Sequence, residues 1–166
     1  DIKVGNEEPR RIEIVLFGKT HPKAAENFRL LCTGEKGFAQ DGTKLHYKGS
    51  KVFELLGWAY MAFGDFYSNR KCGISASEPF FPESYKIGHN GSGYISMVPC
   101  RLETVANHGK VNSMFQIMGV EFPMNDDHAP VIGKVLFRDD IDWILNNILR
   151  KYGDELGALH YSRFIP

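Results

Sequence analysis

The hydrophobic positions of this chain are densest in residues 52–66, which have the sequence VFELLGWAYMAFGDF. Gly57 divides this run into two pieces that are too short for separate helices and are rich in aromatic residues, so the pattern predicts two adjacent β-strands. Glu54 and Asp65 are the only charges in the run. A carboxylate among apolar residues must find a partner, reach water or take up a proton. The surroundings of Glu54 therefore bear directly on function.

Alternation of apolar and polar residues predicts further short strands on both sides of this run. Residues 2–4 and 11–17 are β-prone and are separated by a link that contains Gly, Asn and Pro, so we expect them to form a hairpin. The other expected strands lie at residues 94–98, 114–119, 131–137 and 159–165. Together with the two strands of the dense run, the total is about eight.

Two of these strands show which way their side chains should face. In residues 11–17, one set of alternate positions is aliphatic and should face a core; it consists of Ile12, Ile14 and Leu16. In residues 114–119, both sets of alternate positions are largely apolar. This second strand should therefore lie between two layers of the fold.

Two segments have the three- and four-residue spacing of amphipathic helices. The first should begin at Pro22 and end before Gly34. Its apolar stripe consists of Ala24, Ala25, Phe28, Leu31 and Cys32. The second should begin at Asp139 or Asp140 and end before Gly153, with a stripe of Ile141, Ile144, Leu145, Ile148 and Leu149. Short strands with two distant helices predict an antiparallel barrel or sandwich whose open ends the helices cover.

Length and composition predict a single globular domain over residues 1–166. Twenty basic residues balance twenty acidic ones, whereas a nucleic-acid-binding protein usually has a basic excess, so no nucleic-acid partner is indicated. No apolar run approaches the roughly 20 residues that span a bilayer, so no membrane span is expected. The six histidines are scattered without the spacing of metal ligands. We therefore expect neither a metal nor a cofactor.

The three cysteines, Cys32, Cys72 and Cys100, are odd in number and contain no CxxC pair. We expect three reduced thiols, which are typical of a reducing compartment such as the cytoplasm or an organelle matrix. A disulfide or a redox role is the alternative. The sequence begins at Asp1 without an initiator Met, so it says nothing about a targeting segment, and localisation stays open.

Several segments, in order along the chain, resemble the cyclophilins. The longest and most specific is AENFRLLCTGEKG at residues 25–37. The others are LHYKGS at 45–50, GDF at 64–66, SGYISM at 92–97 and GKV at 133–135. The resemblance implies an eight-stranded antiparallel β-barrel capped by two α-helices. It also implies a peptide groove on one outer face and an ancestral peptidyl-prolyl cis–trans isomerase activity that needs no metal or cofactor.

The chemistry of such an isomerase is physical rather than covalent. Amide resonance gives an X–Pro bond a rotation barrier of roughly 18–20 kcal/mol. An enzyme lowers it by favouring the twisted amide, whose nitrogen can accept a hydrogen bond. In cyclophilins an Arg beside the proline pocket supplies the positive charge. Phenylalanines, a Met and a Leu form the pocket, while a Gln, an Asn, a Trp and a His hold the peptide.

Nearly all of these residue types are missing at the corresponding positions of this chain. Glu54 occupies the site of the catalytic Arg, and the two pocket phenylalanines are replaced by Ala59 and Gln116. The other replaced groove positions are Tyr60, Ala62, Val98, Pro99, Met114, Met124, Asn125 and Ala129. Met97 and Phe115 are family residues that are retained near the groove. The loop at residues 99–111 is longer than is usual in the family.

These replacements predict a cyclophilin-like domain without isomerase activity that acts as a protein-interaction domain or as a structural subunit of a larger assembly. Each missing apolar side chain, and the missing charged donor, is worth about 1.5–3 kcal/mol. Two alternatives are an active isomerase with an altered site and a non-catalytic module that binds proline-containing peptides. With Ala59, Gln116 and Met124 at contact sites, cyclosporin binding is not expected.

Four roles are open for Glu54 itself. It could be a solvated strand residue without a function, or it could form an ion pair with Lys51 or Arg101. It could also have a new binding role. In the fourth, burial would keep it protonated, so that it could donate to the amide nitrogen.

Overall fold

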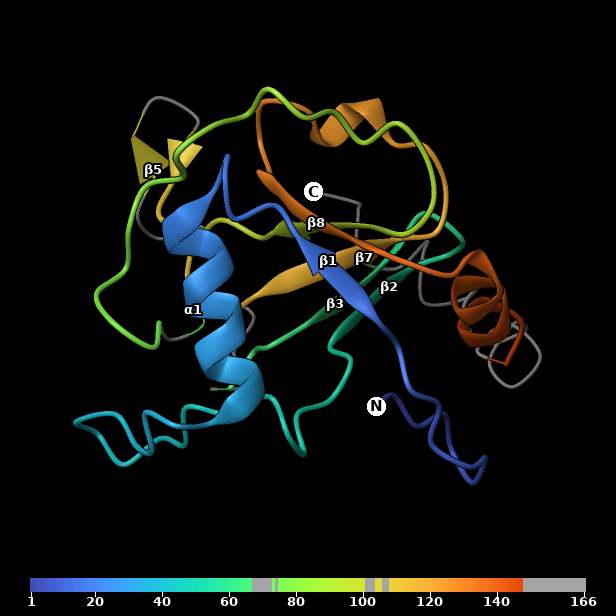
Figure 1. Cartoon of the computed structure of the whole chain (residues 1–166), viewed down its shortest axis with the longest axis horizontal. Helices are drawn as coiled ribbons and strands as arrows, with labels where there is room; N and C mark the ends of the chain where they lie inside the picture. Colours follow the sequence, from blue (N-terminus) through green and yellow to red (C-terminus); the bar gives the residue numbers. More distant parts are fainter. Residues whose placement is uncertain (67–72, 74, 101–103, 106–107, 148–166) are drawn as a thin grey trace, which may run out of the picture.

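A six-stranded antiparallel sheet organises the fold (Figure 1). The structure, a computed structural model, describes residues 1–66, 73, 75–100, 104–105 and 108–147. In their order across the sheet, the strands are β1 (Ile14–Leu16), β8 (Val131–Val135), β4 (Tyr94–Met97), β7 (Phe115–Met118), β3 (Tyr60–Phe63) and β2 (Glu54–Leu56). The dense apolar run forms the hairpin β2–β3, as predicted from the break at Gly57.

Over the described residues the sheet is open and has six strands, instead of the closed eight-stranded barrel that was predicted. β1 and β2 are its two edges, and no described residues pair one with the other. Of the predicted first hairpin, residues 11–17 contain β1, but residues 2–4 form only a single bridge, between Ile2 and Arg10, and no strand of the sheet. β5 (Thr104–Val105) and β6 (His108–Gly109) pair only with each other, because two-residue segments are too short to extend a ladder. The expected strand at residues 159–165 lies outside the described residues.

α1 (Pro22–Thr33) begins and ends where the sequence predicts. A proline occupies its first turn, and Gly34 adopts the left-handed conformation of a helix C-cap, with φ of 69°. A Cβ on Gly34 would lie 2.5 Å from Nδ1 of His46, so both the backbone and the available space require glycine there. One position of the predicted apolar stripe is wrong. Cys32 is exposed, because the helix turns Leu30 toward the interior instead.

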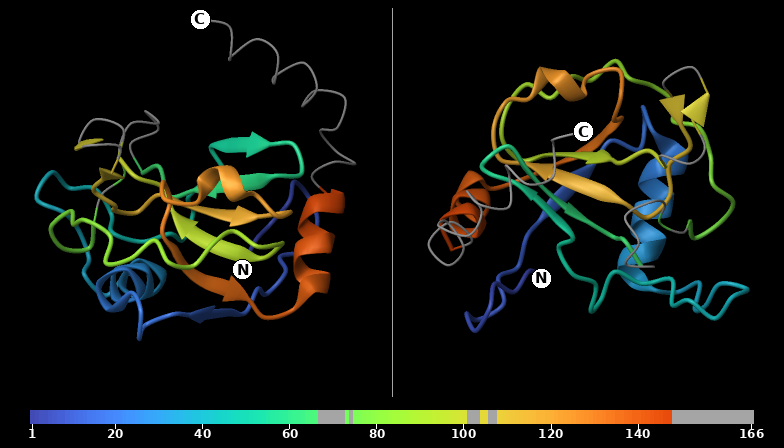
Figure 2. Two further views of the ribbon diagram at one scale, coloured as in Figure 1. Left: turned by 90° about the horizontal axis from the view of Figure 1, so that it is seen from above. Right: turned by 180° about the vertical axis from the view of Figure 1, so that it is seen from behind.

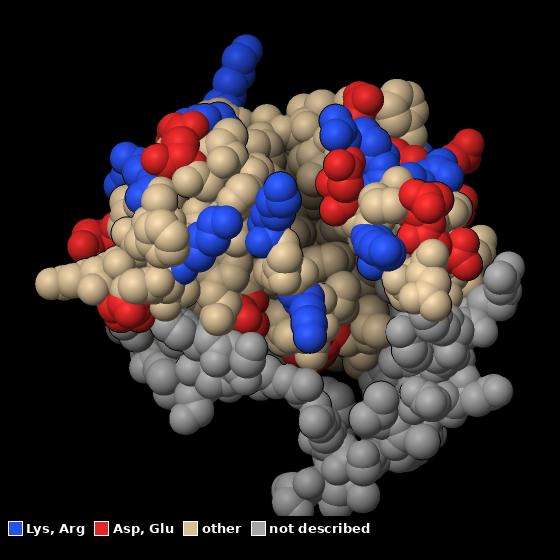
Figure 3. Space-filling model, turned by 90° about the horizontal axis from the view of Figure 1, so that it is seen from below, with Lys and Arg blue, Asp and Glu red and all other residues tan. Residues whose placement is uncertain are grey.

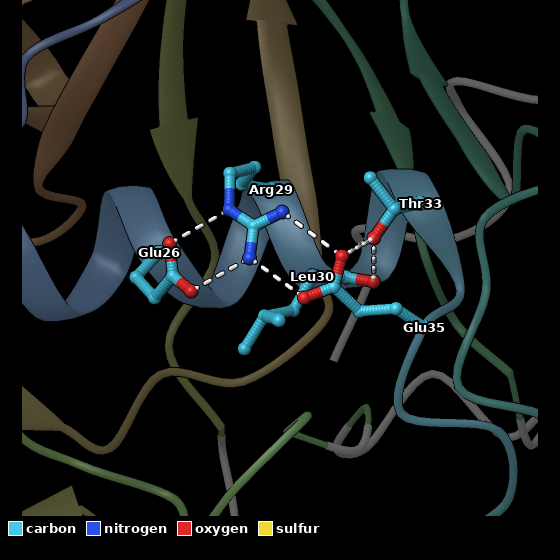
Figure 4. A network of polar contacts seen from close by, with 5 residues as sticks. All are labelled: Glu26, Arg29, Leu30, Thr33 and Glu35. Atoms are coloured by element: carbon cyan, nitrogen blue, oxygen red, sulfur yellow. Dashed lines mark hydrogen bonds and ion pairs between the residues drawn. The ribbon is translucent and has the colours of Figure 1, made fainter.

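The outer face of α1 carries a network of charged side chains (Figure 4). The guanidinium of Arg29 lies 2.8 Å from carboxylate oxygens of both Glu26 and Glu35. The hydroxyl of Thr33 is 2.9 Å from Glu35. Hydrogen bonds from Arg29 and then from Thr33 lower the pKa of Glu35 to about 2. Because the network is exposed to water, it contributes little to stability and mainly fixes the end of the helix.

Asn27, on the inner face of α1, is a buried polar residue that ties the helix to two distant segments. Its side-chain amide donates to the carbonyl of Asn112 at 2.8 Å. Its carbonyl oxygen accepts from the hydroxyl of Ser75 and from the backbone N–H of Ala76, both at 2.9 Å. All three donors and acceptors are buried, so the side chain satisfies groups that water cannot reach.

The second helix begins at residue 138 and is described through residue 147. Asp139 and Asp140 therefore lie in its first turn instead of capping it, and its predicted end at Gly153 lies outside the described residues. The guanidinium of Arg10 lies 2.7 Å from Asp140. This helix and α1 lie at opposite ends of the sheet (Figure 2). None of the helices in the described part of the chain is long and apolar enough to cross a membrane.

One hydrophobic core joins the sheet to both helices. Its buried members include Phe28 of α1 and Ile144 of the second helix. The strand residues that belong to it are Met61, Phe63, Ile95, Met97, Phe115, Ile117, Ile132 and Val135. Ile12, Ile14 and Leu16 pack against it, as their alternation predicts. Every residue of β7 is buried, so the prediction of a strand between two layers is confirmed.

The cysteines differ from the prediction. Cys32 is a free cysteine, but Cys100 is disulfide-bonded, so the expectation of three reduced thiols is wrong. Cys72 lies outside the described residues. Disulfides persist in oxidising compartments. The cysteines therefore no longer argue for a reducing compartment.

Candidate functional site

A row of four side chains crosses the sheet on the face opposite the core. The strand pairing places Glu54 beside Ala62, Ala62 beside Gln116, and Gln116 beside Ser96. Paired residues share one face of a sheet, and neighbours along a strand alternate between faces. The residues between them on β3, β4 and β7 belong to the core. The row therefore lies on the outer side of the sheet and runs from the partly exposed Glu54 to the fully buried Ser96.

At the exposed end of this row, Glu54 is held by an aromatic neighbour. The hydroxyl of Tyr60 donates to Oε1 of Glu54 at 3.1 Å. The ring of Tyr60 makes an edge-to-face contact with Phe122, with 5.9 Å between ring centroids. Among the described residues, Glu54 forms no ion pair with Lys51, and Arg101 lies outside them. Glu54 is thus a carboxylate that is hydrogen-bonded to a tyrosine whose ring contacts Phe122.

At the buried end, a series of polar contacts leads from Gln116 toward the surface. Nε2 of Gln116 donates to Oγ of Ser96 at 2.9 Å, and this oxygen lies 3.0 Å from Nε2 of His89. Nδ1 of His89 lies 2.7 Å from Oδ1 of Asp126. A carboxylate only accepts, so a neutral His89 donates from Nδ1 and accepts the Ser96 hydroxyl proton at Nε2.

Burial and hydrogen bonding together shift the pKa values of His89 and Asp126. Burial lowers the pKa of His89, although the hydrogen bond and the charge of Asp126 oppose the change. For Asp126, burial raises the pKa, but hydrogen bonds from the side chain and backbone of His89 outweigh it and leave a lowered pKa. The order Asp126, His89 and Ser96 resembles a catalytic triad. Because Ser96 is fully buried, no substrate can reach its hydroxyl, and the arrangement is structural.

Comparison with known protein families fits this fold. A family model described as "Cyclophilin type peptidyl-prolyl cis-trans isomerase/CLD" matches residues 1–149. The chain belongs to the cyclophilin family. The match extends over both described helices and all six strands of the sheet. The residue-by-residue correspondence at the groove stays a prediction.

The cyclophilin domain brings several of the predicted groove positions together. Glu54, Tyr60, Ala62 and Gln116 share the outer face of the β2–β3–β7 ladder. Ala59 lies at the turn before Tyr60 and is partly exposed. Its carbonyl accepts from Gly119 at 2.8 Å, which fastens the turn to the segment after β7.

The remaining predicted positions are spread along the connections of the cyclophilin domain. The backbone N–H of Val98, next to Pro99, donates to the carbonyl of the buried Met114 at 2.9 Å. The short 3-10 helix η1 (Pro123–Asn125) carries Met124 and Asn125. Met124 is 78% exposed. The N–H of the buried Ala129 donates to the carbonyl of Asn125 at 3.0 Å.

Two retained family residues lie away from this face. Met97 and Phe115 are buried in the core, on the opposite side of the sheet from Glu54 and Gln116. The ring of Phe115 stacks on Phe63 at a centroid distance of 5.0 Å. Both residues therefore support the sheet from within.

Sequence reasoning missed Phe122 and the polar chain behind Gln116. Phe122 precedes a proline in a turn-rich stretch, and nothing in its local pattern indicates a contact with Tyr60. A signal did exist for Ser96, because it alternates with the core residues Ile95 and Met97 and so falls on the outer face. No comparable pattern indicates His89.

The charged side chains of the described surface do not gather into a metal site. The described residues contain no group of three or more His, Cys, Asp and Glu side chains that could hold a metal ion. On the face of the cyclophilin domain seen from below, Lys and Arg side chains surround a central hollow, and acidic side chains lie among them (Figure 3). This face therefore presents mixed charge.

Acidification should destabilise the domain through His89. Because the pKa of His89 is lowered in the folded state, the His89 side chain binds a proton more readily in the unfolded chain. Stability is therefore lost as the pH falls below the unfolded pKa of about 6.5. His89→Asn should reduce the dependence of the unfolding free energy on pH, measured by urea unfolding between pH 5 and 7. The exposed His128, changed to Asn, is the matched control and should keep the wild-type slope. An unchanged slope in His89→Asn would contradict this role.

Proposed function

We propose that this cyclophilin domain lacks effective peptidyl-prolyl isomerase activity and serves as a protein-interaction domain or a structural subunit of a larger assembly. One observation carries the proposal. The side chain at the position that corresponds to the family's catalytic Arg is Glu54, and its hydrogen-bond partner is the Tyr60 hydroxyl. An ionised carboxylate accepts hydrogen bonds and cannot supply one to the nitrogen of a twisted amide.

The charge of Glu54 also acts against the reaction. The pyramidal nitrogen of the twisted amide is an electron-rich acceptor, and the transition state is stabilised by a nearby cation or donor. A carboxylate at the same place has the wrong sign. The change therefore removes a favourable interaction and adds an unfavourable one.

A second change concerns the residues at the positions of the family's proline pocket. Ala62 and Gln116 lie side by side, and both are buried, so this part of the outer face offers almost no exposed surface to a ligand. The amide of Gln116 is engaged by Ser96, which places a polar group where the family has an aromatic ring. The binding free energy that a proline ring gains here by burial is therefore smaller. The loss is about 1.5–3 kcal/mol for each large apolar side chain that is missing from the proline pocket.

A protease-coupled assay on a standard Xaa-Pro peptide tests the proposal. The wild-type domain should accelerate isomerisation about a thousandfold less than a cyclophilin with an intact Arg and aromatic pocket, which serves as the positive control. Acceleration close to that of the control would overturn the proposal and favour an active isomerase with an altered site.

A further inference from the structure

The turn between β2 and β3 and the segment after β7 carry exposed apolar and aromatic side chains close to the carboxylate of Glu54 in the fold. We call this set the acidic–aromatic surface and define it as Glu54, Trp58, Tyr60, Phe122 and Met124. Glu54 and Tyr60 are hydrogen-bonded, and Tyr60 contacts Phe122. Trp58 is 67% exposed and Met124 is 78% exposed. Exposed large apolar side chains on two segments whose backbones contact each other are unusual on a surface that contacts only water.

Two segments distant in the sequence are locked together to build this surface. The turn between β2 and β3 contributes Trp58, and the segment after β7 contributes Phe122. The N–H of Gly119 donates to the carbonyl of Ala59 at 2.8 Å. A Cβ on Gly119 would lie only 1.9 Å from the carbonyl oxygen of Trp58, so the two backbones touch. The surface is therefore held in place by backbone contacts before any partner arrives.

The charge of both segments has a single sign. Residues 52–66 and residues 111–133 contain no Lys or Arg. The acidic residues that they carry are Glu54, Asp65, Glu121, Asp126 and Asp127. Of these, Glu121 and Asp127 are exposed next to η1. The negative charge of these two segments favours a cationic partner.

We propose that the acidic–aromatic surface binds an arginine side chain from an extended segment of a protein partner. A guanidinium is planar, so it can stack on the ring of either Tyr60 or Phe122, which lie edge to face, while its N–H groups donate to the carboxylate of Glu54. This inference rests on the protein-interaction part of the proposed function, because it names the kind of side chain that such a domain would bind at Glu54. Arginine is favoured over lysine, whose ammonium lacks the planar face and the forked donors.

Titration calorimetry with blocked octapeptides of Gly and Ser tests this inference. One peptide carries two adjacent arginines, and its match carries two citrullines, which keep the shape but lose the charge. The arginine peptide should bind at least about tenfold more tightly, and its affinity should fall as salt is raised, since the contact is partly exposed. Equal affinity of the two peptides would overturn the inference.

Variants of the full chain identify the contact. Glu54→Gln should weaken binding of the arginine peptide at least about tenfold, and Phe122→Leu should weaken it severalfold. Glu7→Gln changes an exposed acid in the N-terminal turn and is the matched control, which should leave affinity unchanged. Wild-type affinity in Glu54→Gln would overturn the inference, as would tighter binding of an uncharged Xaa-Pro octapeptide.

The two proposals can fail separately. If no arginine peptide binds and the isomerase assay shows no acceleration, this inference is wrong and the proposed function stands. If isomerisation is fast and the arginine peptide binds through Glu54, the proposed function is wrong and the arginine site stands.

Discussion

Installing a cation and an aromatic ring together, by Glu54→Arg with Ala59→Phe, is expected to raise the catalysed rate of Xaa-Pro isomerisation about a hundredfold over the wild-type domain. The guanidinium supplies a charged donor worth about 1.5–3 kcal/mol, and the ring supplies an apolar contact of similar size. At about 1.4 kcal/mol for each factor of ten, these gains multiply in the rate. Both sites are partly exposed, so the larger side chains need not displace the core.

The control for this variant is Glu54→Gln with Ala59→Phe. It removes the carboxylate and adds the same ring but supplies no cation, so its gain should be about tenfold smaller. The protease-coupled assay measures all three proteins, and thermal unfolding verifies that each is folded. If the Arg variant were no faster than the Gln variant, the charge at residue 54 would not be what limits the activity.

Asn27→Ala is expected to lower the free energy of unfolding by about 3 kcal/mol. The substitution leaves the carbonyl of Asn112 and the N–H of Ala76 buried without their partner, and each such group costs about 1–3 kcal/mol. For a domain of this size, the melting temperature should fall by about 10 °C. Unfolding in urea gives the free energy directly.

Asn146→Ala is the matched control for that measurement. Asn146 is exposed on the second helix, so its truncation should change stability by no more than about 0.5 kcal/mol. A loss below about 1 kcal/mol in Asn27→Ala would mean that water replaces the missing side chain. The attachment of α1 to residues 75–76 and 112 would then depend on packing alone.

Local pattern was sufficient for α1, for the six strands of the main sheet and for the faces of those strands. Gly57 correctly marks the turn between β2 and β3, and the helix signals correctly bound α1. Alternation also places Gln116 and Ser96 on the outer face, because each neighbours core residues on its own strand. These features depend on residues close together in the sequence, and sequence patterns report such features well.

Contacts between residues far apart in the sequence could not be predicted from local patterns. Closure of a barrel depends on whether two edge strands meet, and no residue within either edge signals it; in the part of the chain that the structure describes, β1 and β2 do not meet. The contact between Tyr60 and Phe122 joins two loops whose relative position follows from the pairing of β3 with β7. Asn27 belongs to a helix that is otherwise apolar on its inner face, so its partners at residues 75, 76 and 112 could not be inferred.

The order of the strands has a consequence for how the chain reaches its native state. β1 pairs with β8, so residue 14 meets residue 135. During synthesis the first strand therefore leaves the ribosome long before its neighbour exists, and apart from β2 with β3, the strand pairs of the main sheet also join distant segments. Non-local pairing of this kind slows folding. The nascent chain should thus depend on chaperones until β8 has emerged, and truncation before residue 131 should yield an aggregating product.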